Sequence, residues 1–310
     1  MKKNKLKRRK KLTLSELEQC KIAVLNSLGS LQSHRCYKHA FVEFIDWYCS
    51  EPRLTLNRKV VLQYRLHLES LHLSPATMNL HLAAIRRLAF EATDHGLLSP
   101  ELVSGIQRVK GIKRFELRVG NWLTLDEGQQ LLGAATTDTL RGKRDMAMLG
   151  LLFGCGLRRS ELAGLELDRI QQREKHWVIV DLVGKAGHIR TVPIPEWVMK
   201  TVHAWISAAE IKNGKLFRPI RKNGAVWGER ITDNVVWYTV KQCARRAGIN
   251  KLAPHDLRRT CARLCHLAGG ELEQIQFLLG HVSVSTTEKY LGCKQKLREA
   301  VNDRILLDGV

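Results

Sequence analysis

Apolar residues in the first third of the chain recur every three or four positions, which is the spacing of one face of an α-helix. Gly29 follows the first of these segments and Ser74-Pro75 opens the last, and such residues commonly end and begin helices. The pattern therefore predicts a helical bundle over residues 13–108. Its four helices are expected over residues 14–28, 33–49, 59–71 and 74–96.

The rest of the chain mixes helical and strand patterns. Thr124 and Glu127 form a predicted capping box, and a similar box at Ser285 and Glu288 is expected to begin the helix that carries Tyr290. Two β-rich runs joined by a glycine-rich turn predict one small antiparallel sheet. The expected fold is mainly α with this sheet added. The strands are expected over 177–180 and 189–193, and the helices near 125–132, 144–153, 232–248, 256–268, 271–279 and 285–291.

The domain boundaries follow from where the periodicity stops. Residues 109–121 have little periodicity and several charges, so they are predicted to be a linker. A second domain, of the α+β type, is expected over 122–293. Residues 294–310 place charged groups between apolar ones and predict an amphipathic tail helix, which could fold back on its own domain or dock on a neighbouring subunit.

The charge of the chain predicts a polyanionic partner. The 310 residues include 51 Lys and Arg against 30 Asp and Glu, a formal net charge of +21. Residues 1–12 form a basic arm with no acidic residue. Such an arm is often only a solvated segment, but the remainder of the chain is also basic, which favours contact with the phosphates of a nucleic acid.

Other classes of protein are not favoured. No apolar run approaches the ~18 residues of a membrane span, and the N-terminus lacks the apolar stretch of a signal peptide, so a cytoplasmic protein is expected. The eight cysteines include no CxxC pair and are expected to stay reduced. Cys261, Cys265 and His266 lie close together, but without a second ligand pair they favour core packing over zinc. No metal site is predicted.

Four short strings in the second half carry side chains suited to cutting a phosphodiester without a metal ion. That chemistry needs a nucleophile, positive charge on the phosphate oxygens and a proton for the leaving oxygen. Two Arg, one Lys, two His and one Tyr, all present in these strings, would supply it. The strings are Gly156-Leu157-Arg158-Arg159-Ser160-Glu161-Leu162, Gly184-Lys185, Pro254-His255-Asp256-Leu257-Arg258, and Leu279-Gly280-His281 with Tyr290 nine residues after the histidine.

The order and flanking residues of these strings resemble the tyrosine recombinase, or phage integrase, family. The resemblance extends over nearly the whole chain and implies a DNA-binding bundle followed by a catalytic domain. It implies Tyr290 as nucleophile, Lys185 as the donor of a proton to the leaving 5′ oxygen, and Glu161 as a support. The other implied catalytic residues are Arg158 and Arg258 as phosphate clamps, with His255 and His281 as hydrogen-bonding or proton-accepting groups.

Taken singly, several of these residues have plainer interpretations. Arg159 could replace Arg158 by chemistry alone, a lysine at a hairpin tip often serves only solubility, and a helical Tyr is more often a core residue. The family most often has His after its second arginine. This chain has Arg259 there, and the resemblance leaves its role open.

The implied function is site-specific DNA recombination by a recombinase or integrase of a mobile element, through a 3′-phosphotyrosyl intermediate and without a cofactor. The expected partners are DNA with paired inverted half-sites and three further copies of the chain. One alternative is a type IB-like topoisomerase or hairpin resolvase, and another is a DNA-binding protein that has lost activity. Basic residues of the bundle are candidate DNA contacts, with solvated helix faces as the alternative: Arg35, Lys38, Arg86 and Arg87.

Overall fold

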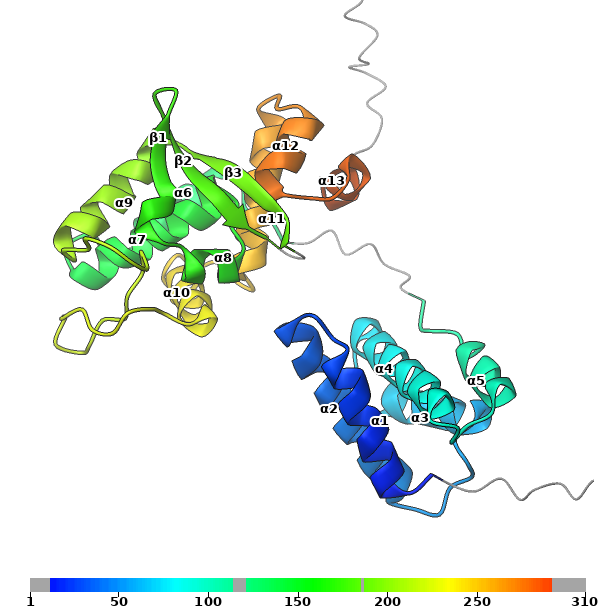
Figure 1. The fold of residues 1–310 in the computed structure, drawn as a ribbon. Helices are drawn as coiled ribbons and strands as arrows, with labels where there is room; N and C mark the ends of the chain where they lie inside the picture. Colours follow the sequence, from blue (N-terminus) through cyan, green and yellow to red (C-terminus); the bar gives the residue numbers. More distant parts are fainter. Residues whose placement is uncertain (1–11, 114–120, 185–186, 292–310) are drawn as a thin grey trace, which may run out of the picture. The chain divides into compact units, whose positions relative to one another are not determined.

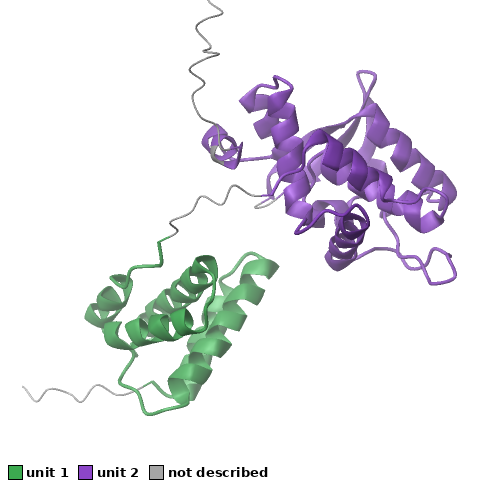
Figure 2. Cartoon of the chain, turned by 180° about the vertical axis from the view of Figure 1, so that it is seen from behind, with its two compact units in different colours: residues 1–117 green, residues 118–310 purple. Residues whose placement is uncertain are grey.

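The computed structural model of the chain describes residues 12–113, 121–184 and 187–291 (Figure 1). The chain divides into two compact units, residues 1–117 and residues 118–310 (Figure 2), and each has its own hydrophobic core. Each unit is described by itself.

Several predicted features lie outside the described residues. They are residues 1–11 of the basic arm, residues 114–120 of the linker, Lys185, and residues 294–310 of the tail.

Unit 1 is a bundle of helices built around α4, which contacts the other four helices of the described part of this unit. Thr13 and Glu16 form a capping box before α1, and the Ser74 hydroxyl accepts from the Thr77 amide where Pro75 begins α4. The four predicted helices are present, and a fifth, α5, follows them. The helices are α1 (Leu14–Asn26), α2 (Leu31–Cys49), α3 (Arg58–Ser70), α4 (Pro75–Asp94) and α5 (Pro100–Gln107).

Unit 2 packs helices around one small sheet (Figure 1). Its core centres on α7, a helix with ten buried residues that packs on α9 and α11. The Thr124–Glu127 capping box predicted for α6 is present. The helices are α6 (Leu125–Gly133), α7 (Leu140–Gly154), α8 (Arg159–Gly164), the 3₁₀ turn η1 (Leu167–Arg169), α9 (Glu196–Ala208), α10 (Asp233–Arg246), α11 (Pro254–Leu267), α12 (Leu272–Leu279) and α13 (Val284–Leu291).

The sheet has three antiparallel strands in the order β1-β2-β3: β1 (Ile170–Arg173), β2 (His176–Val183) and β3 (Ile189–Ile194). Strand β1 was not predicted, because Ile-Gln-Gln-Arg lacks the alternation of a half-buried strand. On β3, Val192 and Ile194 are buried and Arg190 shares their face. An arginine is therefore directed toward the inside of the unit from a strand position.

One predicted helix start is wrong. The hydroxyl of Ser283, not that of Ser285, accepts a hydrogen bond from the backbone of Thr286 at 3.3 Å, and α13 begins at Val284. The chain leaves α12 through Gly280, whose φ of +60° is left-handed, and this early turn lets Ser283 reach the capping position. Helix α13 therefore begins two residues earlier than a cap at Ser285 would allow.

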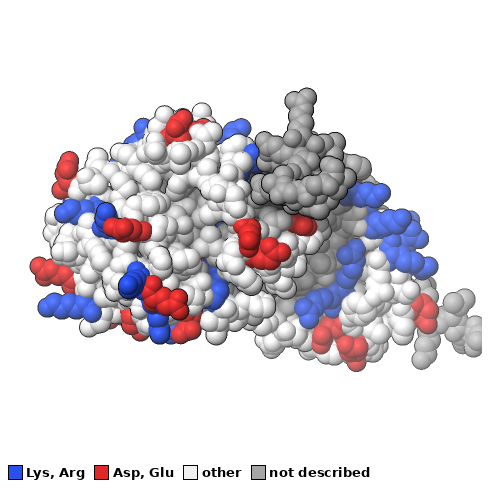
Figure 3. Space-filling view, turned by 90° about the horizontal axis from the view of Figure 1, so that it is seen from above, with Lys and Arg blue, Asp and Glu red and all other residues white. Residues whose placement is uncertain are grey.

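Taken together, the elements confirm the predicted fold class, a mainly helical protein with one small antiparallel sheet. None of the described helices has the length and apolar content required to cross a lipid bilayer. On the face of unit 2 seen in Figure 3, basic side chains lie next to acidic ones, so the positive charge of the chain is not gathered there.

Candidate active site

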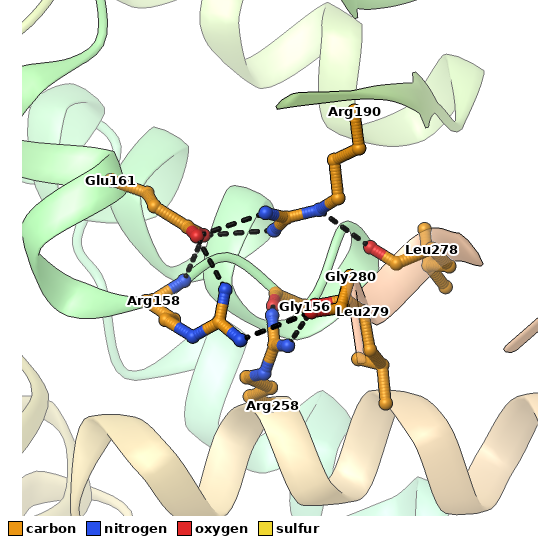
Figure 4. A network of polar contacts seen from close by, with 8 residues as sticks. All are labelled: Gly156, Arg158, Glu161, Arg190, Arg258, Leu278, Leu279 and Gly280. Atoms are coloured by element: carbon orange, nitrogen blue, oxygen red, sulfur yellow. Dashed lines mark hydrogen bonds and ion pairs between the residues drawn. The ribbon is translucent and has the colours of Figure 1, made fainter. Parts of the chain in front are cut away.

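Glu161 is the centre of a buried polar network (Figure 4). Its carboxylate accepts from the backbone amide of Arg158 at 2.8 Å and from the Arg158 Nη1 at 2.7 Å. Burial alone would raise the pKa of Glu161, but hydrogen bonds from Arg190 and Arg158 outweigh it and lower the pKa to about 2. Glu161 is therefore an ionised support for arginine side chains, which is the role the sequence assigned to it.

Arg190 is the second cation held by this carboxylate. Its Nη1 and Nη2 donate to the two oxygens of Glu161, each at 2.9 Å, and its Nε donates to the Leu278 carbonyl at 3.1 Å. A Cβ on Gly280 would lie 2.8 Å from the Arg190 Cδ. Glycine at position 280 thus meets two needs, a left-handed backbone and the close approach of an arginine.

Arg258 is the most buried of the three arginines, with 1% of its surface exposed. Its guanidinium donates to the carbonyl of Gly156 at 2.5 Å and to the carbonyl of Leu279. Burial and the nearby charge of Arg158 lower the pKa of Arg258 to about 10, so the group stays charged at neutral pH. It has no carboxylate partner among the described residues, which leaves its charge available to an anion.

The three guanidinium groups converge on the segment from Leu278 to Gly280 (Figure 4). Arg158 arrives from the start of α8, Arg190 from β3 and Arg258 from α11, and the Arg158 Nη2 lies 3.5 Å from the Gly280 carbonyl. Preorganised cations of this kind can stabilise the charge on a phosphoryl group during displacement. The arrangement fits the predicted pair of phosphate clamps, Arg158 and Arg258, and adds Arg190.

His281 follows Gly280 directly. Its Nδ1 lies 3.0 Å from the hydroxyl of the buried Thr287. Burial and the charges of Arg258, Arg158 and Arg190 lower the pKa of His281 to about 4. A neutral imidazole carries one N–H, and a Thr287 hydroxyl that donates to Nδ1 leaves Nε2 as the donor.

Tyr290 is on α13, close to both histidines. Its ring centre lies 5.2 Å from that of His281 and 5.8 Å from that of His255. Its hydroxyl is buried and has no hydrogen-bond partner among the residues the structure describes. Burial raises the pKa of Tyr290 to about 12, against the opposing charges of Arg258 and Arg259. An unpaired buried hydroxyl is costly, which is a feature expected of a group that awaits a substrate.

His255 completes the group of predicted residues that meet here. It precedes Arg258 by one helical turn on α11. Desolvation and the charges of Arg259 and Arg258 lower its pKa, so it is neutral near pH 7 and able to accept a proton.

The two adjacent arginines of the first string, Arg158 and Arg159, have different partners in the structure. Arg158 points into the Glu161 network, whereas the Arg159 Nε lies 3.5 Å from an Asp233 carboxylate oxygen and its side chain is 40% exposed. Lys185 is not described, but a Cβ on its neighbour Gly184 would lie 3.3 Å from the Arg158 Nη1. Of the six predicted catalytic residues, five are therefore described and lie together, and the sixth follows a residue that adjoins them.

Arg190 is a residue of the candidate site that was not predicted from the sequence. A usable signal was present: an arginine at the same strand parity as Val192 and Ile194 faces inward, and a buried cation needs polar partners, which at Arg190 include the Glu161 carboxylate.

The four residues predicted to contact DNA in unit 1 differ in their exposure and hydrogen bonding. Arg35 and Lys38 on α2 are exposed. Arg87 on α4 is exposed and donates to the Ser27 hydroxyl at 3.3 Å, but Arg86 is half-buried and donates to the Val109 carbonyl at 2.5 Å. Arg86 thus holds the segment after α5 against the bundle.

Comparison with known proteins identifies the family. Residues 121–296 match the phage integrase family. The chain belongs to the phage integrase family. It is 33% identical over 229 residues to the tyrosine recombinase XerC of Azotobacter vinelandii, covering 73% of this chain and 72% of that protein. It is 27% identical over 271 residues to the tyrosine recombinase XerD of Listeria monocytogenes, covering 85% and 88%.

Solved structures of this integrase family share the fold. XerH site-specific recombinase bound to a palindromic difH substrate has a TM-score of 0.70 at 18% identity, covering 90% of this chain and 80% of that one. A lambda integrase dimer bound to a COC′ core site has a TM-score of 0.69 at 17% identity, covering 90% and 77%. The predicted enzyme class, a tyrosine site-specific recombinase, is confirmed by the family match and the named relatives.

Proposed function

We propose that this recombinase cuts and rejoins double-stranded DNA through a bond between Tyr290 and the 3′ phosphate, with no cofactor. The observation that carries the proposal is the position of the Tyr290 hydroxyl. The hydroxyl is buried and unpartnered among the described residues, the tyrosine ring lies beside two histidine rings, and the charge of Arg258 acts on the phenol. A site with three converging arginines suits a phosphodiester better than a neutral substrate.

The proposed reaction balances as a displacement at phosphorus. The Tyr290 oxygen attacks, the bond to the 5′ oxygen breaks, and the phenol proton passes to a neutral acceptor, for which we propose His255. Arg158 and Arg258 hold the non-bridging oxygens, His281 donates a hydrogen bond to them, and Lys185 supplies a proton to the leaving oxygen. Reversal of the same steps on a new 5′ end rejoins the strand.

The number of subunits follows from the substrate proposed. XerH is described in complex with a palindromic site. For this chain we propose two inverted half-sites on each duplex, one protomer per half-site and four protomers when two duplexes recombine. The domain plan proposed for each protomer is an arm (1–12), a bundle (13–108), a linker (109–121), a catalytic domain (122–293) and a tail (294–310).

The proposed DNA contacts combine the basic arm with exposed residues of the bundle, Arg35, Lys38 and Arg87. Their support is the net charge of +21 and the exposure of these side chains. A role on DNA places the protein with the nucleoid in the cytoplasm. The link to a mobile element stays a prediction.

Covalent trapping on a nicked duplex tests the nucleophile. In Tyr290→Phe the ring still packs but the attacking oxygen is gone, so we expect DNA binding to persist and covalent adduct to disappear. Tyr238→Phe is the matched control, because Tyr238 is 63% exposed on α10 and takes no part in the site. An adduct at the wild-type level in Tyr290→Phe would assign the nucleophile elsewhere, and loss of binding would indicate a structural tyrosine.

A further inference from the structure

Arg259 makes a contact with Tyr290 that the proposed reaction does not yet use. The guanidinium carbon lies 5.2 Å from the centre of the Tyr290 ring. A cation within about 6 Å of a ring face is attracted by the ring's quadrupole. The two residues come from different helices, α11 and α13, so the contact joins the helix of the phosphate clamp to the helix of the nucleophile.

Arg259 differs from Arg258 and Arg159 in its hydrogen-bond and ion-pair partners. Arg258 donates to two backbone carbonyls and Arg159 pairs with Asp233. For Arg259, by contrast, no carboxylate partner is found among the described residues, and its buried Nε has no hydrogen-bond partner there either. An arginine placed beside the reacting group without a counter-ion keeps its full charge for the Tyr290 ring and the substrate.

The apolar support of Tyr290 is small. The ring and Leu291 pack at the edge of a cluster of three buried residues, Ala262, Ile275 and Leu279. Helix α13 is described over Val284–Leu291, and Tyr290 is the last but one of these residues. Among the described residues the apolar contacts of the ring are few, so the guanidinium contact contributes to its orientation beside the two histidine rings.

We infer that Arg259 is a positioning residue for the nucleophile: its guanidinium stacks on the Tyr290 ring, aims the hydroxyl and favours the phenolate as attack begins. The inference rests on the proposed role of Tyr290. Burial raises the pKa of Tyr290, and the charge of Arg259, with that of Arg258, acts against this rise, which is the direction that eases loss of the phenol proton. Together with desolvation, the same charge lowers the pKa of His255 and so favours its unprotonated form, the form that can accept a proton.

The chain provides a matched control one turn further along α11. The Arg263 guanidinium carbon lies 3.8 Å from the centre of the Trp122 ring, and its buried Nε also has no partner among the described residues. Arg259→Ala and Arg263→Ala thus remove the same kind of contact from the same helix. Only the first of these contacts involves the nucleophile.

The measurement is single-turnover cleavage of a nicked half-site duplex at saturating protein. Arg259→Ala is expected to slow cleavage about 3- to 30-fold, the range of a cation–π contact of about 0.5–2 kcal/mol. Arg263→Ala should stay within about twofold of the wild type. Arg259→Lys keeps the charge without the planar group and should fall between Arg259→Ala and the wild type.

Arg259→His adds a readout that a merely structural role would not change. An imidazole loses its charge as the pH rises through about 6.5. The ratio of Arg259→His to wild-type cleavage should therefore fall between pH 6 and pH 8 and approach that of Arg259→Ala. If Arg259→Ala fails to fold, this ratio still decides the question.

Three results would overturn the inference. The first is equal cleavage by the Arg259→Ala and Arg263→Ala variants, and the second is a ratio of Arg259→His to wild-type cleavage that does not change with pH. The third is a defect of Arg259→Ala confined to DNA affinity, with the slope of affinity against salt concentration reduced by about one, because that result indicates a phosphate contact. Tyr290→Phe separates this failure from that of the proposed function. If Tyr290→Phe still forms adduct, both fail; if it forms none and Arg259→Ala cleaves normally, only the inference fails.

Discussion

Arg190 on β3 and Glu161 on α8, which are 29 residues apart in the chain, form a bidentate ion pair. Both of its N–O distances are 2.9 Å. Their side chains are 8% and 3% exposed. A planar guanidinium opposite a carboxylate satisfies both groups with fixed geometry. Since Glu161 also holds Arg158, the orientation of this proposed phosphate clamp depends on the ion pair.

Glu161→Gln should destabilise the protein and slow cleavage. A fall in pKa from 4.5 to about 2 corresponds to roughly 3 kcal/mol of stability at neutral pH. This contribution is complete above the ordinary pKa of the carboxyl and is lost as the pH falls toward 2. Urea unfolding followed by tryptophan fluorescence measures it. Glu166→Gln, at an exposed pair with Lys215, should have little effect; an equal loss in both variants would contradict the assignment.

Arg158→Ala should slow cleavage by at least about 10²-fold, the scale for loss of one preorganised donor to the reacting phosphate. Arg159→Ala is the natural comparison, because its partner is Asp233 at the surface and not the Glu161 network. Single-turnover cleavage at saturating protein distinguishes the two. A larger defect in Arg159→Ala would mean that the two arginines have been assigned in the wrong order.

Lys185→Ala should be rescued by a substrate that carries sulfur at the bridging 5′ position. A thiolate leaves without protonation, so a missing general acid no longer matters. The ratio of cleavage rates on the sulfur and oxygen substrates measures the effect, with the wild type as reference. A variant impaired equally on both substrates would restrict Lys185 to binding DNA.

His281→Asn should make the protein less sensitive to mild acid. The pKa of His281 is lowered to about 4, so as the pH falls below the ordinary value of about 6.5 the unfolded chain takes up the proton first. Stability from this group is thus lost between about pH 6.5 and pH 4. Melting temperatures at pH 7 and pH 5 should differ less in the variant. An unchanged difference would show that His281 titrates normally.

Truncation after Cys293 tests the role proposed for the tail. If residues 294–310 dock on a neighbouring protomer, the shortened chain should bind one half-site normally and fail to form the four-subunit complex on paired sites. Light scattering of the DNA-bound protein measures the assembly. An undiminished tetramer would show that the tail packs on its own domain.

The sequence predicted the parts of this protein that depend on local patterns. Helical spacing and capping residues gave four of the helices of unit 1 and the start of α6 correctly, because these signals act within one or two turns. Strand β1 lacked such a signal and was missed. The start of α13 was misplaced because the left-handed turn at Gly280 determines which serine caps the helix.

In the candidate site, too, features that depend on tertiary contacts could not be predicted from local patterns. The family pattern selected the arginines, histidines and tyrosine that the structure brings together and favoured Arg158, whereas residue chemistry alone could not choose Arg158 over Arg159. The structure distinguishes the two by their tertiary partners, Glu161 for Arg158 and Asp233 for Arg159. The contact of Arg259 with Tyr290 also depends on how α11 and α13 pack, which no spacing in the sequence specifies.

Arg190 and Arg258 donate hydrogen bonds to main-chain carbonyl oxygens, those of residues 156, 278 and 279. Every amino acid carries the same carbonyl, so an exchange of side chain at 278 or 279 leaves the acceptor in place. Only a shift of the backbone can remove it. The contacts that Arg190 and Arg258 make with the end of α12 are thus independent of the side chains at 278 and 279, and this part of the site geometry can persist while those side chains diverge.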